Sequence, residues 1–495
     1  MIPGLASGTS GRQRPVMART AEIHDVLIVG GGAAGATLAG RLARAGRDVA
    51  VLEAGPSDRH PLVAMPFGLV WLMGSRRDWA FRSAPQAALG GRRIAIPRGR
   101  MLGGSASINS MVWFRGLPSD YAAWGPGWTW DDVAPAFDAV EARMRPAPLA
   151  HPHPLSRALG AVHGGPPEPG RVSSGPFVVN MARGRRRSPV RAFLDGSGAR
   201  IVTGAEVAML RRDGDRVTGV DLVDGRRIDA RAGVVLCAGA IGSPTLLLRA
   251  GLGGDGVGRN LHDHPGAAVH HEGPGSGYGL TLAQLPRWAA APALWALAGR
   301  GRFASNTVEA GAFLPLRPGG PPEVQVHFLP CRLGHGARAI GWGAGYYADV
   351  CVMRPRSRGR LTLDGAGAPV IDLGLLSDPA DRADLRAGLR MLRDLLRAAP
   401  FGARRAPEVC PGTRAGDGDA ALDAHIDARA GTAYHPVGTC AIGDVVSSDL
   451  AVRGVRGLWV ADAGVMPSIT SANTNAPSIM IGYRGADMVA AALRG

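Results

Sequence analysis

Residues 25–53 read DVLIVGGGAAGATLAGRLARAGRDVAVLE. The apolar run Asp25–Val29 is typical of a buried strand, and the glycines that follow interrupt it. Ala36–Ala45 is rich in alanine and leucine, which favour a helix, and Asp48–Leu52 is a second apolar run. The segment therefore predicts a strand, a tight turn, a helix and a second strand, which is the βαβ unit of parallel sheets.

The turn in this unit carries a glycine pattern that suits a phosphate group. Gly30, Gly32 and Gly35 form G-x-G-x-x-G, and Glu53 ends the second strand. Such glycines let the backbone approach a pyrophosphate at the helix N-terminus, where the helix dipole and free N–H groups favour an anion. An acid about twenty residues further on can hold a ribose hydroxyl. The pattern predicts a dinucleotide site over an ordinary glycine-rich turn, but it does not distinguish NAD from FAD.

Beyond this unit, strand and helix patterns occur in separate stretches of the chain. Short strands with turns at Gly214, Gly219 and Gly225 are predicted over residues 199–237. Further strands are predicted over residues 323–329, 348–363 and 458–461, and helices over residues 381–398 and 477–493. Residues 146–176 are rich in proline and glycine and are predicted to be a loop that crosses between domains. The dinucleotide region is therefore expected to be assembled from separated segments, with another mixed sheet in the middle of the chain.

The composition is that of a globular enzyme. With 495 residues, 46% apolar and 19% charged, the chain is too apolar for intrinsic disorder and long enough for two or three domains. No apolar run reaches the roughly 18–20 residues of a membrane-spanning helix. The nearest run, Trp288–Ala298, contains Pro292. Residues 1–22 are expected to be a disordered leader without a secretory signal, with Met17 as an alternative start.

The net charge of +16 raises the question of a nucleic-acid partner. All of the basic residues are arginine, which indicates the codon bias of a GC-rich genome, and they are spread along the chain. The densest cluster is Arg183, Arg185, Arg186 and Arg187. Because nucleic-acid binding requires clustered charge, no nucleic-acid partner is predicted.

The five cysteines lie far apart and form no C-x-x-C pair. This spacing argues against a structural zinc site and against a disulfide framework. It favours a reducing compartment, so we expect a cytoplasmic protein without a transmembrane segment, while peripheral contact with a membrane stays open.

Four further segments carry a family resemblance. They are RGRMLGGSASINSMVWFRG at 98–116, GAIGSPTLLLRAGLG at 239–253, YHPVGTC at 434–440, and VADAG at 460–464 followed by SANTNAP at 471–477. With these segments the chain resembles the glucose–methanol–choline (GMC) family of FAD-dependent oxidoreductases from Asp25 to the C-terminus. GVGRNLHDHP at 256–265 and SNTVEAGAF at 305–313 add to the likeness, whereas Ala106 and Ala250 depart from the family's patterns.

The resemblance implies an α/β fold (α+β overall). It predicts a Rossmann-like FAD-binding domain and a discontinuous substrate-binding domain built on a mixed or antiparallel sheet. The FAD-binding domain is expected in three parts, at residues 23–150, 199–300 and 431–495. The substrate-binding domain is expected at residues 301–430, together with residues 151–198, which also hold the crossing loops.

The resemblance places the catalytic pair at His435 and Asn473. Alcohol oxidation needs a base for the hydroxyl proton, and histidine, with an ordinary pKa near 6.5, suits that role. Asn473 can only orient the substrate oxygen, which leaves His435 as the base. His262 and His264 are spaced like metal ligands, but they lie in GVGRNLHDHP and are expected to brace a loop, so no metal is predicted.

The resemblance also implies the residues that hold the cofactor. Besides the glycines, Glu53 is expected at the adenosine ribose and Val207 at the adenine. Gly103, Asn109 and Val112 are expected to face the flavin, and Asp462 and Asn475 to lie near the pyrophosphate–ribityl chain and the pyrimidine end of the ring. Segment 98–116 contains no His, Cys or Tyr, so FAD is predicted to be non-covalent.

The implied activity is oxidation of a primary alcohol to the aldehyde, with oxygen, a quinone or another electron acceptor taking up the electrons. We expect a small neutral alcohol rather than choline or a hexose. No ring precedes Glu309 to form an aromatic cage, and Val324, Val326, Phe328 and Leu329 are apolar, with Gln325 and His327 as exceptions. Two alternatives stay open: a flavin-dependent lyase of the hydroxynitrile lyase or photodecarboxylase type, and a choline dehydrogenase.

Overall fold

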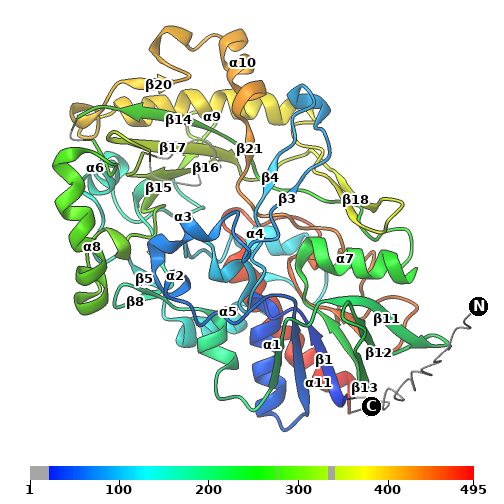
Figure 1. The fold of residues 1–495 in the computed structure, drawn as a ribbon. Coiled ribbons are helices and arrows are strands. Elements are labelled where there is room, and N and C mark those ends of the chain that lie inside the picture. Colours follow the sequence, from blue (N-terminus) through cyan, green and yellow to red (C-terminus); the bar gives the residue numbers. More distant parts are fainter. Residues whose placement is uncertain (1–21, 275, 333–340, 495) are drawn as a thin grey trace, which may run out of the picture.

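The computed structural model describes residues 22–274, 276–332 and 341–494 (Figure 1). Two seven-stranded sheets organise these residues, and each sheet has its own hydrophobic core. The predicted leader lies outside the described residues except for Glu22, which begins the first strand. None of the helices in the described part of the chain combines the length and the apolar character needed to cross a bilayer.

The first sheet draws its strands from three distant parts of the chain. Its order is β10 (Arg200–Thr203), β2 (Val49–Glu53), β1 (Glu22–Val29), β13 (Arg227–Leu236), β12 (Arg216–Leu222) and β11 (Val207–Asp213), and β22 (Leu458–Val460) also pairs with β13. The pairs among β10, β2, β1, β13 and β22 are parallel. Strand β12 pairs antiparallel with both β13 and β11. The predicted assembly from separated segments is confirmed.

The predicted βαβ unit forms, with α1 (Ala33–Arg44) between β1 and β2. The helix begins earlier than predicted because Ala33 and Ala34 directly follow the glycine turn and favour helix. It packs against α11 (Asn475–Ala492), where a side chain at Gly482 would come within 2.3 Å of the Ala34 carbonyl oxygen. The C-terminal helix therefore lies beside the glycine turn.

The second sheet is antiparallel throughout. Its order is β20 (Glu408–Cys410), β14 (Pro265–Glu272), β17 (Gly345–Val352), β16 (Pro322–Leu329), β15 (Ala310–Pro315) and β6 (Ser173–Pro176), and β21 (Gly431–Thr432) pairs with β14. Helix α9 (Pro379–Arg397) lies along this sheet, as Figure 1 shows. It buries an apolar face that consists of Leu385, Leu389, Leu392 and Leu396. The predicted fold class is confirmed.

The remaining elements connect or cover the two sheets. Four hairpins pair β3 (Phe81–Arg82) with β4 (Ala95–Ile96), β5 (Ala147–Pro148) with β7 (Val178–Val179), β8 (Met181–Ala182) with β9 (Arg185–Arg186), and β18 (Arg360–Leu363) with β19 (Pro369–Asp372). The other α-helices are α2 (Pro61–Ala64), α3 (Leu69–Leu72), α4 (Pro118–Ala122), α5 (Trp130–Met144), α6 (Pro154–His163), α7 (Gly239–Ala250), α8 (Leu285–Ala298) and α10 (Asp419–Arg429).

Three local predictions were wrong. Helix α6 lies inside residues 146–176, where only loop was expected, because Pro154 occupies the first turn of the helix, a position that tolerates proline. Gly219 lies within β12 rather than in a turn, and a side chain there would come within 2.4 Å of the Ile228 carbonyl oxygen on the neighbouring strand. The strand predicted over residues 348–363 is divided between β17 and β18. The boundaries of the predicted domains stay a prediction, and β14, inside the predicted second FAD-binding part, pairs in the second sheet.

Candidate active site

A cavity of about 480 Å³ is lined by residues of both sheets. The first sheet supplies the glycine turn and the carboxyl ends of β2 and β13, and the second sheet supplies residues of β16 and β17. Ligands of open α/β sheets bind at the carboxyl ends of the strands, where the strand order changes direction. Most of the predicted site residues line the cavity: Gly30, Gly32, Glu53, Asn109, Val112, Val207, His435, Asp462, Asn473 and Asn475.

The glycine turn is shaped by close backbone contacts. Gly30 has a φ of +97°, and a side chain there would come within 2.6 Å of the Cys237 carbonyl oxygen. A side chain at Gly35 would come within 2.0 Å of the Gly30 carbonyl oxygen. At Gly32, the N-cap of α1, the nearest atoms would lie 3.9 Å away, so this backbone faces open space in the cavity. The turn and the helix N-terminus therefore offer free backbone to an anion.

Glu53 lies at the carboxyl end of β2. Its buried carboxylate accepts hydrogen bonds from the backbone N–H groups of Gly31 at 3.0 Å and Gly55 at 2.8 Å. Burial raises its pKa, and the two backbone donors oppose that shift. Val207, at the start of β11, lines the same part of the cavity. The two backbone donors therefore hold the carboxylate beside the glycine turn.

Segment 98–116 is tied to the glycine turn. The Gly103 N–H donates to the Gly31 carbonyl oxygen at 2.7 Å, while the next residue, Gly104, lines the cavity. Asn109 Oδ1 accepts from the Met111 N–H at 3.0 Å and from Arg186 at 2.7 Å. Gly103 and Gly35 themselves do not line the cavity. Their close backbone contacts hold the neighbouring residues that do.

Asp462 and Asn475 lie where β22 and α11 meet the cavity. The Asp462 carboxylate accepts from Gly239 N–H and Gly464 N–H, each at 2.8 Å, and from the Ser243 hydroxyl at 2.5 Å. Burial raises its pKa. Asn475 begins α11, and its side-chain Nδ2 is buried without a hydrogen-bond partner among the described residues. An unpaired buried N–H donor costs free energy, so this amide is suited to an acceptor group of a ligand.

His435 and Asn473 meet in the cavity although they come from different loops. Asn473 Nδ2 lies 3.2 Å from His435 Nε2, and Asn473 Oδ1 accepts from Gln325 Nε2 at 3.1 Å. Because Gln325 fixes the orientation of the amide, its N–H group points at the imidazole. Burial lowers the pKa of His435 well below its ordinary value, and His264, His327 and Arg98 lower it further. The imidazole is therefore neutral.

His264 determines which nitrogen of His435 carries the proton. His264 Nε2 lies 3.1 Å from the Thr470 carbonyl oxygen, which can only accept, and burial lowers the pKa of His264 to about 3. A neutral His264 therefore carries its proton on Nε2 and leaves Nδ1 bare. The Nδ1 atoms of His264 and His435 lie 3.1 Å apart, so His435 carries its proton on Nδ1. Its bare Nε2 accepts from Asn473.

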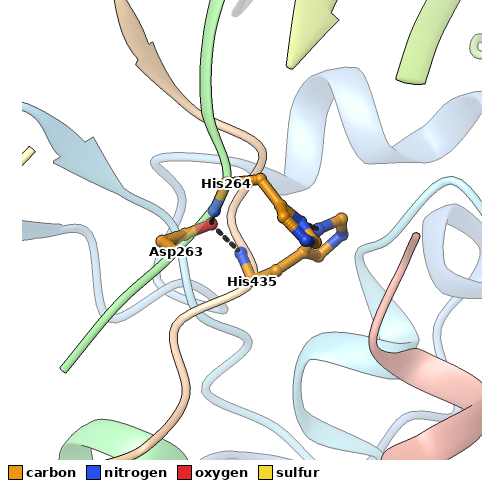
Figure 2. A group of neighbouring side chains, drawn as sticks. All are labelled: Asp263, His264 and His435. Atoms are coloured by element: carbon orange, nitrogen blue, oxygen red, sulfur yellow. Dashed lines mark hydrogen bonds between the residues drawn. The ribbon is translucent and has the colours of Figure 1, made fainter. Parts of the chain in front are cut away.

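Asp263 fixes the two histidines in place, as Figure 2 shows. Its Oδ1 accepts from the backbone N–H of His264 at 2.7 Å and of His435 at 2.9 Å. The ligand atoms of Asp263, His264 and His435 lie close enough together for a metal ion. Hydrogen bonds already engage Asp263 Oδ1 and the ring nitrogens of both histidines, however, and we interpret the group as a device that positions the imidazole. His262 bonds the Asn260 carbonyl oxygen and the Ile469 N–H, so it does brace a loop, whereas His264 contacts His435.

The second sheet contributes a charged pair that the sequence did not reveal. His327 on β16 and Asp349 on β17 are directly opposite in the strand pairing, and both line the cavity. His327 Nδ1 lies 3.3 Å from the Asp349 carboxylate. Burial alone would lower the pKa of His327, but Asp349 raises it to about 10. His327 Nε2 is buried without a partner among the described residues, so the imidazolium has a free N–H donor.

The alternation along β16 predicted that one of its faces meets the pocket, without indicating which one. Val324, Val326 and Phe328 belong to the core of the second sheet, whereas His327 and Leu329 line the cavity. Four aromatic rings also line the cavity, namely Trp79, Phe81, Tyr347 and Tyr434. These rings come from β3, from β17 and from loops beside them. The elements are far apart in the sequence, so no local sequence pattern predicts that the rings meet.

Comparisons with known proteins agree with this geometry. Two family models, each described as GMC oxidoreductase, match residues 24–266 and 355–482. An alcohol dehydrogenase [acceptor] of Pseudomonas putida is 33% identical over 94% of this chain and 96% of its own. The chain belongs to the GMC oxidoreductase family. As a GMC oxidoreductase, it is an FAD-dependent enzyme that oxidises CH–OH donors.

Other similar proteins differ in what they act on. An oxygen-dependent choline dehydrogenase of Brucella anthropi is 33% identical over 94% of this GMC oxidoreductase and 95% of its own chain. The crystal structure of pyridoxine 4-oxidase from Mesorbium loti superposes with a TM-score of 0.81 at 26% identity, covering 94% of this chain and 98% of that one. The family is therefore certain, whereas the substrate varies among these similar proteins.

The residues of this GMC oxidoreductase fit the FAD of its family. The turn at Gly30–Gly35 leaves backbone open to a pyrophosphate, and no acidic residue lies in the first turn of α1. The unpartnered Nδ2 of Asn475 supplies a donor on the wall of the cavity. Sequence reasoning missed Asp349 as a site residue and assigned no role to His327. It also underrated His264, although the place of His264 in GVGRNLHDHP was a usable signal.

Proposed function

We propose that this protein oxidises a neutral primary alcohol to the aldehyde, with His435 as the catalytic base and Asn473 as the partner of the substrate oxygen. The observation that carries this proposal is the bare Nε2 of a neutral His435, held beside the Asn473 amide in the cavity. A base must be unprotonated and within hydrogen-bond reach of the proton that it removes. The low pKa of His435 supports the first condition, and its place in the wall of the cavity supports the second.

The cofactor site is proposed from the residues around the cavity. Gly30, Gly32 and Gly35 shape the pyrophosphate site, Glu53 holds the ribose and Val207 meets the adenine. Gly103, Asn109, Val112, Asp462 and Asn475 complete the site toward the flavin. When bound, FAD supplies the acceptor that takes a hydride from the substrate carbon.

The proton path follows from the same contacts. His435 Nε2 takes the hydroxyl proton, and the Asn473 N–H donates to the oxygen as negative charge develops on it. His264 accepts from Nδ1–H of His435 and so keeps the second nitrogen aimed at the substrate. Oxygen, a quinone or another acceptor completes the turnover. The five cysteines are free thiols, which supports a cytoplasmic location.

We propose a neutral substrate because the cavity leaves no carboxylate for a cation. Its acidic residues are all engaged: Glu53 and Asp462 with backbone donors, Glu206 with Arg100 at 2.8 Å, and Asp349 with His327. Glu309 accepts from the His153 N–H and from two serine hydroxyls. The rings and the His327 N–H suit an aryl or alkyl alcohol, since rings pack against apolar groups and the N–H can meet an oxygen.

Benzyl alcohol and short alkanols should bleach the visible flavin absorbance under anaerobic conditions, and their kcat/KM values should exceed that of choline. The His327 imidazolium repels a quaternary ammonium, and its carboxylate partner is already paired. Steady-state assays with this panel, together with peroxide yield, measure both the substrate preference and the use of oxygen. A flavin that no alcohol bleaches would favour the lyase alternative.

The variant His327→Leu separates the two substrate classes. It leaves Asp349 as an unpaired carboxylate, so choline should gain relative to benzyl alcohol, whereas Asp349→Asn should not favour choline. FAD content is measured in each variant to confirm that the cavity is intact. A choline kcat/KM well above those of the neutral alcohols in the unmodified enzyme would overturn the proposed substrate class.

We also propose that FAD is bound without a covalent link. Cys237 lines the cavity, but burial raises the pKa of its thiol well above the ordinary value, so it is a poor nucleophile. Segment 98–116 offers no His, Cys or Tyr. Acid precipitation should therefore leave a yellow supernatant and a colourless protein pellet. A yellow pellet would show a covalent flavin.

A further inference from the structure

Helix α8 exposes an apolar surface on the outside of the protein. Only Ala291 and Trp295 of this helix are buried, and Figure 1 shows it at the edge of the fold. Leu297 is 90% exposed and Leu294 47% exposed. The α8 surface consists of these two leucines with the exposed Leu282, Leu285 and Trp71. Apolar patches of this kind mark sites of interaction with another surface.

Aromatic contacts connect Trp71 to the helix. Phe67 contacts the rings of Trp71, Trp288 and Phe303 at centroid distances of 5.6, 5.7 and 6.1 Å. Trp295 lies in the same cluster and anchors α8 through a hydrogen bond from its indole N–H to the Gly184 carbonyl oxygen at 2.8 Å. The α8 surface therefore rests on a buried apolar cluster that contains Phe67 and Trp295.

The charge around the α8 surface has one sign. Residues 273–308 contain no acidic residue, and Arg287 and Arg300 lie at the two ends of the helix. The β8–β9 hairpin places Arg183 beside the C-terminal end, where the backbones of Gly184 and Gly299 meet. No ion pair within the described part of the chain engages Arg183, Arg287 or Arg300. Two residues of the densest arginine cluster thus lie by α8, because Arg185 lies over the Trp295 ring at 4.5 Å and Arg183 lies beside Gly299.

Exposed leucines bordered by arginines favour one kind of binding partner over another. A second copy of the chain bound through this surface in a symmetric dimer would bring arginines against arginines, without acids to pair them. An anionic lipid surface provides opposite charge for the arginines and an apolar layer for the leucines. Helix α8 is too short to cross the roughly 30 Å of hydrocarbon, so it would lie along the surface.

We propose that the α8 surface binds an anionic membrane peripherally. Leucine and tryptophan side chains insert into the boundary between headgroups and acyl chains, and Arg183, Arg287 and Arg300 contact phosphates. Leu69 and Val70, which line the cavity, belong to the same apolar cluster as Trp295 beneath the helix. Membrane contact therefore takes place next to the wall of the active site. This proposal does not depend on the identity of the substrate.

Vesicle co-sedimentation of the full-length, FAD-loaded protein tests the proposal. The protein should sediment with phosphatidylcholine vesicles that contain phosphatidylglycerol, and should bind at least tenfold more weakly to pure phosphatidylcholine and at high salt. The double variant Leu294→Glu/Leu297→Glu should lose at least tenfold in binding. The control Val223→Glu/Val409→Glu adds the same charge at residues that are 65% and 48% exposed, and should bind within twofold of the unmodified protein.

Three results would overturn the proposal: no binding of the unmodified protein to anionic vesicles, equal losses in both double variants, or binding that is indifferent to lipid charge. Light scattering measures the molar mass in solution and so tests the alternative that the α8 surface binds a second copy of the chain. A dimer that the α8 variant converts to a monomer, in a protein that does not bind vesicles, would assign this surface to a second copy of the chain. Flavin content, measured in parallel, confirms that each variant is folded.

Discussion

Replacing His435 with alanine should lower the rate of flavin reduction by an alcohol about 10²–10⁴-fold, the usual cost of losing a positioned general base. FAD should remain bound, because the side-chain contacts of the imidazole within the described part of the chain are with His264 and Asn473 and not with the glycine turn. Asn473→Asp should also slow the reaction, since a carboxylate repels the negative charge that develops on the substrate oxygen. Anaerobic stopped-flow measurement of flavin bleaching gives both rates directly.

His163→Ala is a suitable control for this experiment. His163 ends α6, is exposed and does not line the cavity, so its loss should leave the reduction rate within about twofold. Near-normal reduction in His435→Ala would refute the assignment of the base. A reduced rate accompanied by loss of flavin would instead place His435 among the cofactor ligands.

Gly30→Ala should abolish stable FAD binding. The residue has a φ of +97°, which costs an alanine about 1 kcal/mol or more, and the new methyl group would lie 2.6 Å from the Cys237 carbonyl oxygen. The turn must then move away from β13, and the backbone that faces the pyrophosphate moves with it. Visible flavin absorbance per mole of purified protein measures the loss.

Gly46→Ala separates backbone strain from the close contact. Gly46 has a φ of +84°, but a side chain there meets nothing within 4 Å. This variant should bear a similar conformational cost, lose a few degrees in Tm and keep its FAD. If Gly30→Ala retained a full complement of flavin, the tight turn would not be what shapes the cofactor site.

The βαβ unit was predictable because its information is local. An apolar run, a glycine turn and an alanine-rich stretch specify β1, α1 and β2 without distant contacts, and only the helix start was misplaced. Helix α6 was not recognised because prolines were interpreted as helix breakers. Pro154 instead begins the helix, and the His153 ring accepts a hydrogen bond from the Leu155 N–H at 3.1 Å. The position of Pro154 at the start of the helix, rather than the number of prolines in the segment, was the evidence for a helix.

In the candidate site, too, some residues could be predicted from the sequence and others could not. Family patterns indicated His435 and Asn473, and the fold brings the two side chains to 3.2 Å. The pair of His327 and Asp349 depends on the register between β16 and β17, which the sequence of neither strand determines. Alternation along β16 predicted two faces, but only the packing of Val324 and Val326 into the core shows which face lines the cavity.

The three-segment origin of the first sheet has a consequence for biosynthesis. The ribosome makes the glycine turn long before it makes β22, Asp462 and Asn475. Until then a nascent chain exposes the edge of β13 that later pairs with β22 and the face of α1 that later packs on α11. The lining of the cavity stays incomplete until Asp462 and Asn475 have been made, and the period before that is when a chaperone has most to protect.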